Sequence, residues 1–327
     1  MIIINYYQTM VDLTYNVSDK LKSYLDISED IRKRILLAPI SPKVELRLKW
    51  EANLERIKWS LSLLDDTLSK SDIFQLLSKA PKRKLTSQEK NIIDQRKAFS
   101  YIREDWLVSN KTVTMATIKK LYDISCRPTL GKMAGLTQYS EKNMQAVLDY
   151  LQNGQENPII QAGIAQIQLI KTRLFDNGNG RISRLLSYLL LYKNGYDARE
   201  MVILDEFYRK DLMSFKKAIE TALAQKNLTY WLEYFSYGMM VQLKKALDII
   251  NNEKFQQDLP AAFWKINDRH RDIVRYLEQP GLRITNKNVQ KMFGVSQITA
   301  SRDLAKLSNL GLLFPHGKGR SVYYTRV

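Results

Sequence analysis

Apolar residues recur at intervals of three and four over much of this chain, which is the spacing of one face of an α-helix. The pattern is clear from residue 31 to about residue 77, for instance at Leu54, Ile57, Leu61 and Leu64. Only 13 glycines and 8 prolines occur in 327 residues, and 45% of the residues are hydrophobic. We therefore expect a mainly α protein with a packed interior.

Capping and turn residues divide this pattern into separate helices. Pro42 marks one start, and Thr86 with Glu89 marks another as a capping box. Helices are expected over residues 86–106, 114–124, 140–151, 158–172, 181–193, 206–224 and 229–256. The basic run Lys79–Lys84 is expected to be a solvated loop. Residues 127–139, with two glycines and one proline, are expected to form an irregular loop or a short hairpin.

The charge and the scarcity of histidine limit the function classes. The formal net charge of +17 attracts polyanions, of which nucleic acid is the first candidate. His270 and His316 are the only histidines, so histidine–metal clusters and most catalytic triads are excluded. Both are expected to be structural or surface residues, and the single Cys126 a packing residue. Without a membrane-spanning run or a cleavable start, the expected location is the cytoplasm.

A polar segment from Arg173 to Arg184 lies between two apolar helical segments. Gly178 and Gly180 allow a tight turn with positive φ, and the next helix points its positive dipole end at the same place. Arg181 and Arg184, three residues apart, are expected on neighbouring sides of the first helical turn, where each could grip phosphate oxygens. The turn is therefore predicted to bind a di- or triphosphate. The alternative is a purely structural turn with two surface arginines.

The segment reads Arg-Leu-Phe-Asp-Asn-Gly-Asn-Gly-Arg-Ile-Ser-Arg and resembles the Fic family motif, His-x-Phe-x-(Asp/Glu)-Gly-Asn-(Gly/Lys)-Arg-x-x-Arg. The matching positions are Phe175, Gly178, Asn179, Gly180, Arg181 and Arg184. The resemblance covers roughly residues 40–250. It implies an all-helical core with a short flap hairpin, phosphate binding by these six residues, and ATP or another nucleotide as ligand. It also implies a protein target docked at the flap, residues 127–139.

Two departures from the family motif remove its catalytic groups. Arg173 stands where the family has its histidine base, and arginine stays protonated and offers no lone pair. Asn177 stands where the family has an acidic Mg²⁺ ligand, and its neutral carbonyl is a weaker ligand than a carboxylate. Asp176 could serve as a metal ligand but lies one position out of register. No catalytic residue is assigned, and the charge of Arg173 would either strengthen phosphate binding or be a surface replacement.

Many Fic proteins also carry an inhibitory helix whose glutamate pairs with the second motif arginine. The best match here is Ser60–Thr67, in which Asp65 takes the glutamate position while Leu61 and Asp66 break the pattern. The resemblance therefore implies, at most, a contact from Asp65 to Arg184.

The C-terminal region follows a different pattern beyond a boundary at residues 255–265. Short helices over 270–277, 286–293 and 297–310, followed by a hairpin, indicate a small winged-helix α+β domain. The segment Gly294–Leu304 resembles winged helix-turn-helix domains of bacterial regulators, which often read Gly-Val-Ser-x-x-Thr-Ala-x-Arg-Asp-Leu. Residues 265–327 hold 12 Lys or Arg against 4 Asp or Glu.

Double-stranded DNA is the expected partner of this region. Ile298, Leu304 and Leu307 are expected in its core, since they are apolar and lie on the helix after the turn. The residues left for DNA are Gln297, Thr299, Ser301, Arg302 and Lys306 on that helix, and Lys318 and Arg320 at the tip of the wing. The alternative is a domain for protein interaction or dimerisation only.

The sequence thus predicts an N-terminal helical region over 1–105 packed on a Fic-like core over 106–255, and a winged helix-turn-helix over 262–327. The leading hypothesis is a regulator in which a degenerate nucleotide site is coupled to DNA binding, with a homodimer as the expected assembly. The rival is an active adenylyltransferase that transfers AMP from ATP to a protein hydroxyl. A scaffold with neither activity is the third hypothesis.

Overall fold

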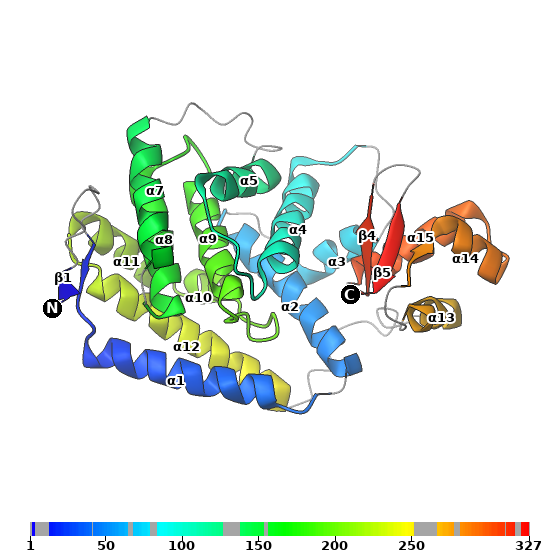
Figure 1. Cartoon of the computed structure of the whole chain (residues 1–327), viewed down its shortest axis with the longest axis horizontal. Coiled ribbons are helices and arrows are strands. Elements are labelled where there is room, and N and C mark those ends of the chain that lie inside the picture. The colour runs from blue at the N-terminus through cyan, green and yellow to red at the C-terminus, as the bar shows by residue number, and fades with distance from the viewer. Residues whose placement is uncertain are drawn as a thin grey trace.

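A computed structural model of the chain describes residues 2–3, 13–40, 42–64, 68–78, 84–126, 138–153, 156–251, 267–277, 282–310, 312–317 and 322–326. Most of these residues are helical, as the periodicity predicts (Figure 1). The helices of the larger part are α1 (Asp19–Leu37), α2 (Pro42–Ser62), α3 (Lys70–Ser78), α4 (Ser87–Trp106), α5 (Met115–Ser125), α7 (Gln138–Asn153), α8 (Pro158–Thr172), α9 (Asn179–Lys193), α10 (Leu204–Lys210), α11 (Leu212–Ala224) and α12 (Thr229–Asn251). Two short strands, β1 (Ile2–Ile3) and β2 (Thr14–Tyr15), pair antiparallel near the N-terminus.

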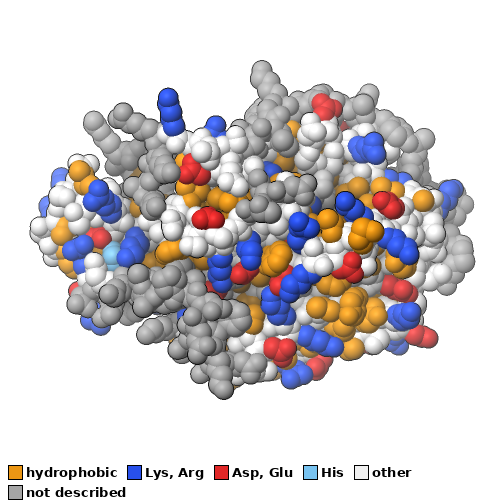
Figure 2. All heavy atoms as spheres, turned by 180° about the vertical axis from the view of Figure 1, so that it is seen from behind, with side chains coloured by type: hydrophobic (Ala, Val, Ile, Leu, Met, Phe, Trp, Pro, Cys, Tyr) orange, Lys and Arg blue, Asp and Glu red, His pale blue; other side chains and the backbone are white. Residues whose placement is uncertain are grey.

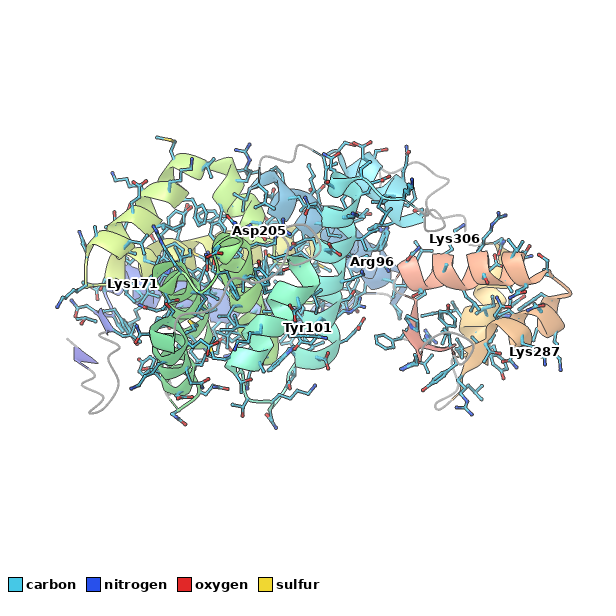
Figure 3. All side chains as sticks on the ribbon, turned by 90° about the horizontal axis from the view of Figure 1, so that it is seen from above. Arg96, Tyr101, Lys171, Asp205, Lys287 and Lys306 are labelled. Carbon is cyan, nitrogen blue, oxygen red and sulfur yellow. The ribbon has the colours of Figure 1, made fainter. Side chains whose placement is uncertain are left out.

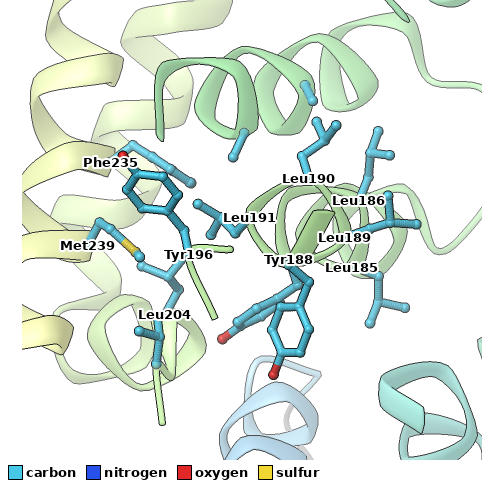
Figure 4. Close-up of a cluster of buried hydrophobic side chains, with 14 of the residues drawn as sticks. Leu185, Leu186, Tyr188, Leu189, Leu190, Leu191, Tyr196, Leu204, Phe235 and Met239 are labelled. Carbon is cyan, nitrogen blue, oxygen red and sulfur yellow. The ribbon is translucent and has the colours of Figure 1, made fainter. Parts of the chain in front are cut away.

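Helices α8 and α9 lie side by side at the centre of this larger part (Figure 1). Every residue of α9 from Arg181 to Tyr192 is buried, and the leucine side chains and Tyr188 of this helix project from it in several directions into the core (Figure 4). Gly163 lets α12 approach α8 closely, since a Cβ there would lie 3.0 Å from the Leu232 side chain. One continuous core runs from Leu13 to Ile250, so the expected N-terminal region and the Fic-like region share it.

Several helix boundaries agree with their sequence signals. The predicted helix 158–172 has these bounds, with Asn157 as N-cap and Pro158 in the first turn. The capping box is present, since Thr86 Oγ1 accepts from Glu89 N at 3.2 Å and Glu89 Oε2 accepts from Thr86 N at 2.9 Å. One expected helix was wrong, because residues 204–224 form two helices. The chain breaks at Asp211, whose carboxylate accepts from Ser214 N at 3.0 Å and caps α11.

Helix α1 begins at Asp19, well before the residue 31 at which the sequence pattern became clear. Its signal was local, because Ser18 caps the helix by accepting from Leu21 N at 3.2 Å and an acidic residue follows directly. Some predictions fall outside the described residues. They concern Asp65, the basic loop through residue 83, the flap over 127–137, the domain boundary at 255–265, Lys318 and Arg320.

The C-terminal part is a winged helix with its own core. Its elements are α13 (Asp268–Tyr276), β3 (Ile284–Thr285), α14 (Asn286–Phe293), α15 (Gln297–Asn309), β4 (Leu313–His316) and β5 (Tyr323–Arg326). The three strands form an antiparallel sheet in the order β3-β5-β4. Leu304 and Leu307 are buried in its core, as expected, together with Ala300. The expected small α+β domain is confirmed.

The two parts touch at the C-terminal end of α15. Arg96 Nη1 on α4 donates to Asn309 Oδ1 at 2.8 Å, and Leu46 of α2 packs against the core of the winged helix. Leu310 contacts both cores. The winged helix is therefore held against α2 and α4 of the larger part (Figure 1).

A buried polar cluster joins α13 to α15 inside the winged helix. Asp303 accepts from Arg269 Nε at 2.6 Å and lies 2.8 Å from His270 Nε2. Because His270 Nδ1 accepts from the Asn267 backbone N–H at 3.3 Å, its Nε2 carries the proton given to Asp303. Burial lowers the pKa of His270 although Asp303 acts in the opposite direction, so the ring is neutral. His270 is structural, as the sequence indicated.

We expect Asp303→Ala to lower the free energy of unfolding of the C-terminal domain by about 2–4 kcal/mol, because Arg269 and His270 both lose their buried acceptor. Urea unfolding followed by circular dichroism measures the change. Asp272→Ala is the matched control, since that exposed carboxylate lies 3.9 Å from Arg275 Nη1 in the same domain. The control should cost less than about 0.5 kcal/mol, and equal losses for both variants would contradict this assignment.

Candidate functional site

The turn between α8 and α9 is fixed at both ends by backbone conformation and packing. Arg173 ends α8 in the left-handed region, with φ 46°. Phe175 is buried and its ring stacks on Tyr122 of α5, with 4.3 Å between ring centroids. Gly178, with φ 87°, is the N-cap of α9, and as a glycine it has no side chain to cap the first turn of that helix. The glycine is needed here because a side chain at this φ would be strained.

Asn179 closes the turn on itself. Its Oδ1 accepts from the Phe175 backbone N–H at 3.0 Å, and its Nδ2 donates to the Phe175 carbonyl oxygen. Both ends of the amide are therefore bound within the turn. Asn179 shapes the turn, and Phe175 anchors it to α5.

Three side chains of the turn are exposed, namely the two that depart from the family motif and the carboxylate between them. Arg173, Asp176 and Asn177 all lie on the outer side of the turn, and Gly180 is exposed beside them. The donor set does not fit a family-type Mg²⁺ site, because it combines one neutral amide, one carboxylate out of register and a cation. Among the described residues, no group of three His, Cys, Asp or Glu side chains is arranged to hold a metal ion.

Arg181 points into the protein and not toward the outer face of the turn. It is 5% exposed. Its Nη1 donates to the Ser125 carbonyl oxygen at the end of α5, and its Nη2 donates to Asn91 Oδ1 on α4 at 3.4 Å. In this arrangement Arg181 ties the motif helix to α4 and α5.

Arg184 is also buried, and it faces a carboxyl group inside the protein. It is 6% exposed, and its Nε lies 2.6 Å from Oδ1 of Asp205, which is fully buried on α10. Its Nη1 donates to the Gly180 carbonyl oxygen at 2.9 Å. Burial raises the pKa of Asp205, and the Arg184 charge opposes that shift. Figure 3 shows Asp205 within the helical part, far from the winged helix.

The sequence analysis expected Arg181 and Arg184 either to grip phosphate oxygens or to be surface arginines, and the structure places both inside the protein. The reason is that α9 is buried on every side from Arg181 onward, and only Asn179 and Gly180 before it reach the surface. Asp205 was missed as a site residue. Its signal was the position of this carboxylate directly after the apolar run Met201-Val-Ile-Leu204, where a charge needs a buried partner.

The second candidate site is the exposed face of α15. Ser296 caps the helix by accepting from Thr299 N at 3.2 Å, and Gly294, with φ 62°, makes the turn after α14. Gln297, Ser301 and Arg302, which the sequence analysis assigns to DNA contact, are exposed on α15. The expectation that Ile298 faces the core was wrong, since it is 65% exposed. Ala300 takes the inward position, four residues before Leu304.

The other predicted DNA residues of α15 are less accessible. Thr299 is half-buried and its Oγ1 lies 3.0 Å from Ser296 Oγ. Lys306 is half-buried and lies toward the larger part of the protein, whereas Lys287 of α14 lies at the opposite end of the domain (Figure 3). On the face shown in Figure 2, Lys and Arg side chains are scattered over both parts of the molecule. The N-terminal half of α15 is thus its accessible polar surface.

Asn286 fixes this surface in place. Its Nδ2 donates to the Gln297 carbonyl oxygen at 3.1 Å and to Ser301 Oγ at 2.7 Å. These bonds join the start of α14 to the first turns of α15. The exposed side chains of α15 are therefore presented from a rigid helix pair.

Comparison with known protein families identifies both parts of the chain. Residues 101–191 match the Fic/DOC family, and residues 269–323 match the DeoR-like helix-turn-helix domain. The first match contains the turn from Arg173 to Arg184, so the expected resemblance is confirmed. Among curated proteins, no sequence matches the chain.

Solved Fic structures share this fold at low sequence identity. A Fic family protein from Desulfovibrio desulfuricans G20 has a TM-score of 0.63 at 14% identity, covering 96% of this chain and 98% of that chain. Fic-1 (aa134 - 508) from C. elegans has a TM-score of 0.58 at 18% identity, covering 69% of this chain and 71% of that one. A Fic domain containing signaling protein from Bacteroides thetaiotaomicron VPI-5482 has a TM-score of 0.56 at 17% identity, covering 72% and 97%.

Three further points concern a membrane-spanning helix, a homodimer and a protein target. None of the helices in the described residues is long and apolar enough to cross a membrane. A homodimer and a protein target at residues 127–139 stay predictions of the sequence.

We expect Arg184→Met and Asp205→Leu each to lower the free energy of unfolding by about 3–5 kcal/mol, because each leaves a buried charge without its partner. The double variant should recover a large part of that loss. Urea unfolding of the four proteins gives the coupling energy.

The matched control is the exposed pair Lys111–Asp105, with 3.1 Å between Lys111 Nζ and Asp105 Oδ1. Its coupling energy should be below about 1 kcal/mol. Additive losses for Arg184 and Asp205 would show that the two charges do not stabilise each other.

Proposed function

We propose that this chain, in which a Fic domain is joined to a DeoR-like helix-turn-helix domain, is a DNA-binding regulator whose Fic domain does not transfer AMP. The observation that carries the proposal is the exposed, rigidly held face of α15 with Gln297, Ser301 and Arg302. Amide, hydroxyl and guanidinium groups at the start of such a helix suit base edges and phosphates in the major groove. The excess of basic over acidic residues from 265 to 327 suits the DNA backbone.

The chemistry of the Fic turn argues against AMP transfer. A target hydroxyl needs a base, and Arg173 at the histidine position has no lone pair to accept a proton. Asn177 offers no carboxylate for Mg²⁺. Arg184 Nε already lies 2.6 Å from the buried Asp205, so this carboxyl group competes with the phosphates of a nucleotide for its charge.

Phosphate binding at the turn is a separate proposal. Some features of the turn favour it and others argue against it. In its favour, the N-cap of α9 is Gly178, which has no side chain to cap the first backbone N–H groups, and the helix dipole points at the turn. Arg173 is exposed beside them. Against it, Arg181 and Arg184 are buried and bound to protein groups. Any nucleotide would therefore be held by the backbone and Arg173, with weaker affinity than two free arginines would give.

Arg302→Ala should weaken binding to double-stranded DNA about tenfold at near-physiological salt, because an exposed guanidinium on the binding face is lost. Lys216→Ala is the control, since it removes one exposed positive charge from α11, which lies at the opposite end of the molecule from α15 (Figure 1). Fluorescence anisotropy with duplexes selected from a randomised pool measures both variants. Equal affinities of the two variants and the unmodified protein would refute a role for this face.

Incubation with labelled ATP, Mg²⁺ and cell lysate should give no label above that of a heat-denatured sample, since the turn lacks a base. Asp176→Asn should behave the same, because Asp176 is the one carboxylate of the turn that could hold a metal. Label transfer that is lost in Asp176→Asn would establish the adenylyltransferase instead. A calorimetric titration with ATP on the same sample tests phosphate binding without turnover.

A further inference from the structure

Ile298 has an apolar side chain that lies at the surface of the C-terminal domain and not in its core. It is 65% exposed, whereas Leu304 and Leu307 of the same helix are fully buried. Among the large hydrophobic residues described in the C-terminal domain it is the most exposed, ahead of Met292 at 45% and Tyr276 at 38%. The core of the domain therefore does not explain why position 298 is isoleucine.

The position of Ile298 on α15 places it among the predicted DNA contacts. It is the second residue of the helix, and Arg302 follows one turn later on the same face. Gln297 and Ser301 form the neighbouring row of that face. In helix-turn-helix domains the N-terminal residues of this helix reach the base edges.

The side chain is also held rigidly. The cap from Ser296 and the two bonds from Asn286 to Gln297 and Ser301 fix the first turns of α15. Isoleucine is branched at Cβ, so its χ1 has one strongly preferred value in a helix. An apolar group presented in this way loses little conformational freedom when it makes a contact.

In the major groove, the apolar group on a base edge is the 5-methyl group of thymine. We propose that Ile298 contacts a thymine methyl group and so sets a preference for thymine at one position of the DNA site. This inference rests on the proposed DNA-binding function. The polar residues Gln297, Ser301 and Arg302 hold the helix in the groove, and Ile298 selects by an apolar contact that buries both groups.

The test removes the methyl group from the DNA and the side chain from the protein. Duplexes bound by the unmodified protein are selected from a randomised pool, and each conserved thymine is then replaced singly by uracil, which lacks the methyl group. At one position the replacement should weaken binding about fourfold, as expected for about 0.8 kcal/mol per buried carbon group. Ile298→Ala should bind the thymine and uracil duplexes equally, and Ile298→Val should keep part of the difference.

Met292→Ala is the control, since it removes an exposed apolar side chain of α14 and should keep the full preference for thymine. If the unmodified protein binds DNA but treats thymine and uracil alike at every position, this inference is wrong while the proposed function stands. The inference is also wrong if Ile298→Ala keeps the preference for thymine, whether or not this variant changes its oligomeric state. If no duplex is bound at all, the proposed function itself fails.

Discussion

The buried ion pair between Arg184 and Asp205 determines how the motif helix sits in this protein. Helix α9 is surrounded on all sides, so any charge in its first turns must be neutralised from within. Asp205 does this from α10 and Arg181 is bound by α4 and α5, which leaves the first turn of α9 locked between three neighbouring helices. The positive charges that the motif brings are therefore used mainly to hold the helices together.

The link from α9 to α10 shows how strongly the surroundings fix Asp205. Ala198, Arg199 and Glu200 all have positive φ, so they form a left-handed turn that costs roughly 1–2 kcal/mol per residue. Arg199 offsets this cost by pairing with Glu45 at 3.1 Å and donating to the carbonyl oxygens of Leu36 and Ala38. The ends of α1 and α2 thereby position α10, and with it the partner of Arg184.

Helix α4 connects the two parts of the molecule. Near its start, Asn91 accepts from Arg181 of the motif helix, and further along Arg96 donates to Asn309 at the end of α15. Helix α2 has a similar position, since Glu45 holds the strained turn and Leu46 packs on the winged helix. The C-terminal end of α15 is thus in contact with the Fic part, which leaves the N-terminal half, with Ile298 and Arg302, as the exposed part of the helix.

The sequence alone determined what depends on neighbours along the chain. Thr86 with Glu89, Asn157 with Pro158, and Ser296 after Gly294 fix helix starts through bonds within four residues, and the Fic motif identifies its domain by residue type and spacing. Asp303 between Arg269 and His270, Asp205 beside Arg184 and the exposure of Ile298 could not be predicted in this way. They depend on which helix face meets another element many residues away, and helical spacing does not specify that choice. That Arg184 lies against the carboxyl group of Asp205 was therefore decided by the tertiary structure, because burial makes an internal partner necessary.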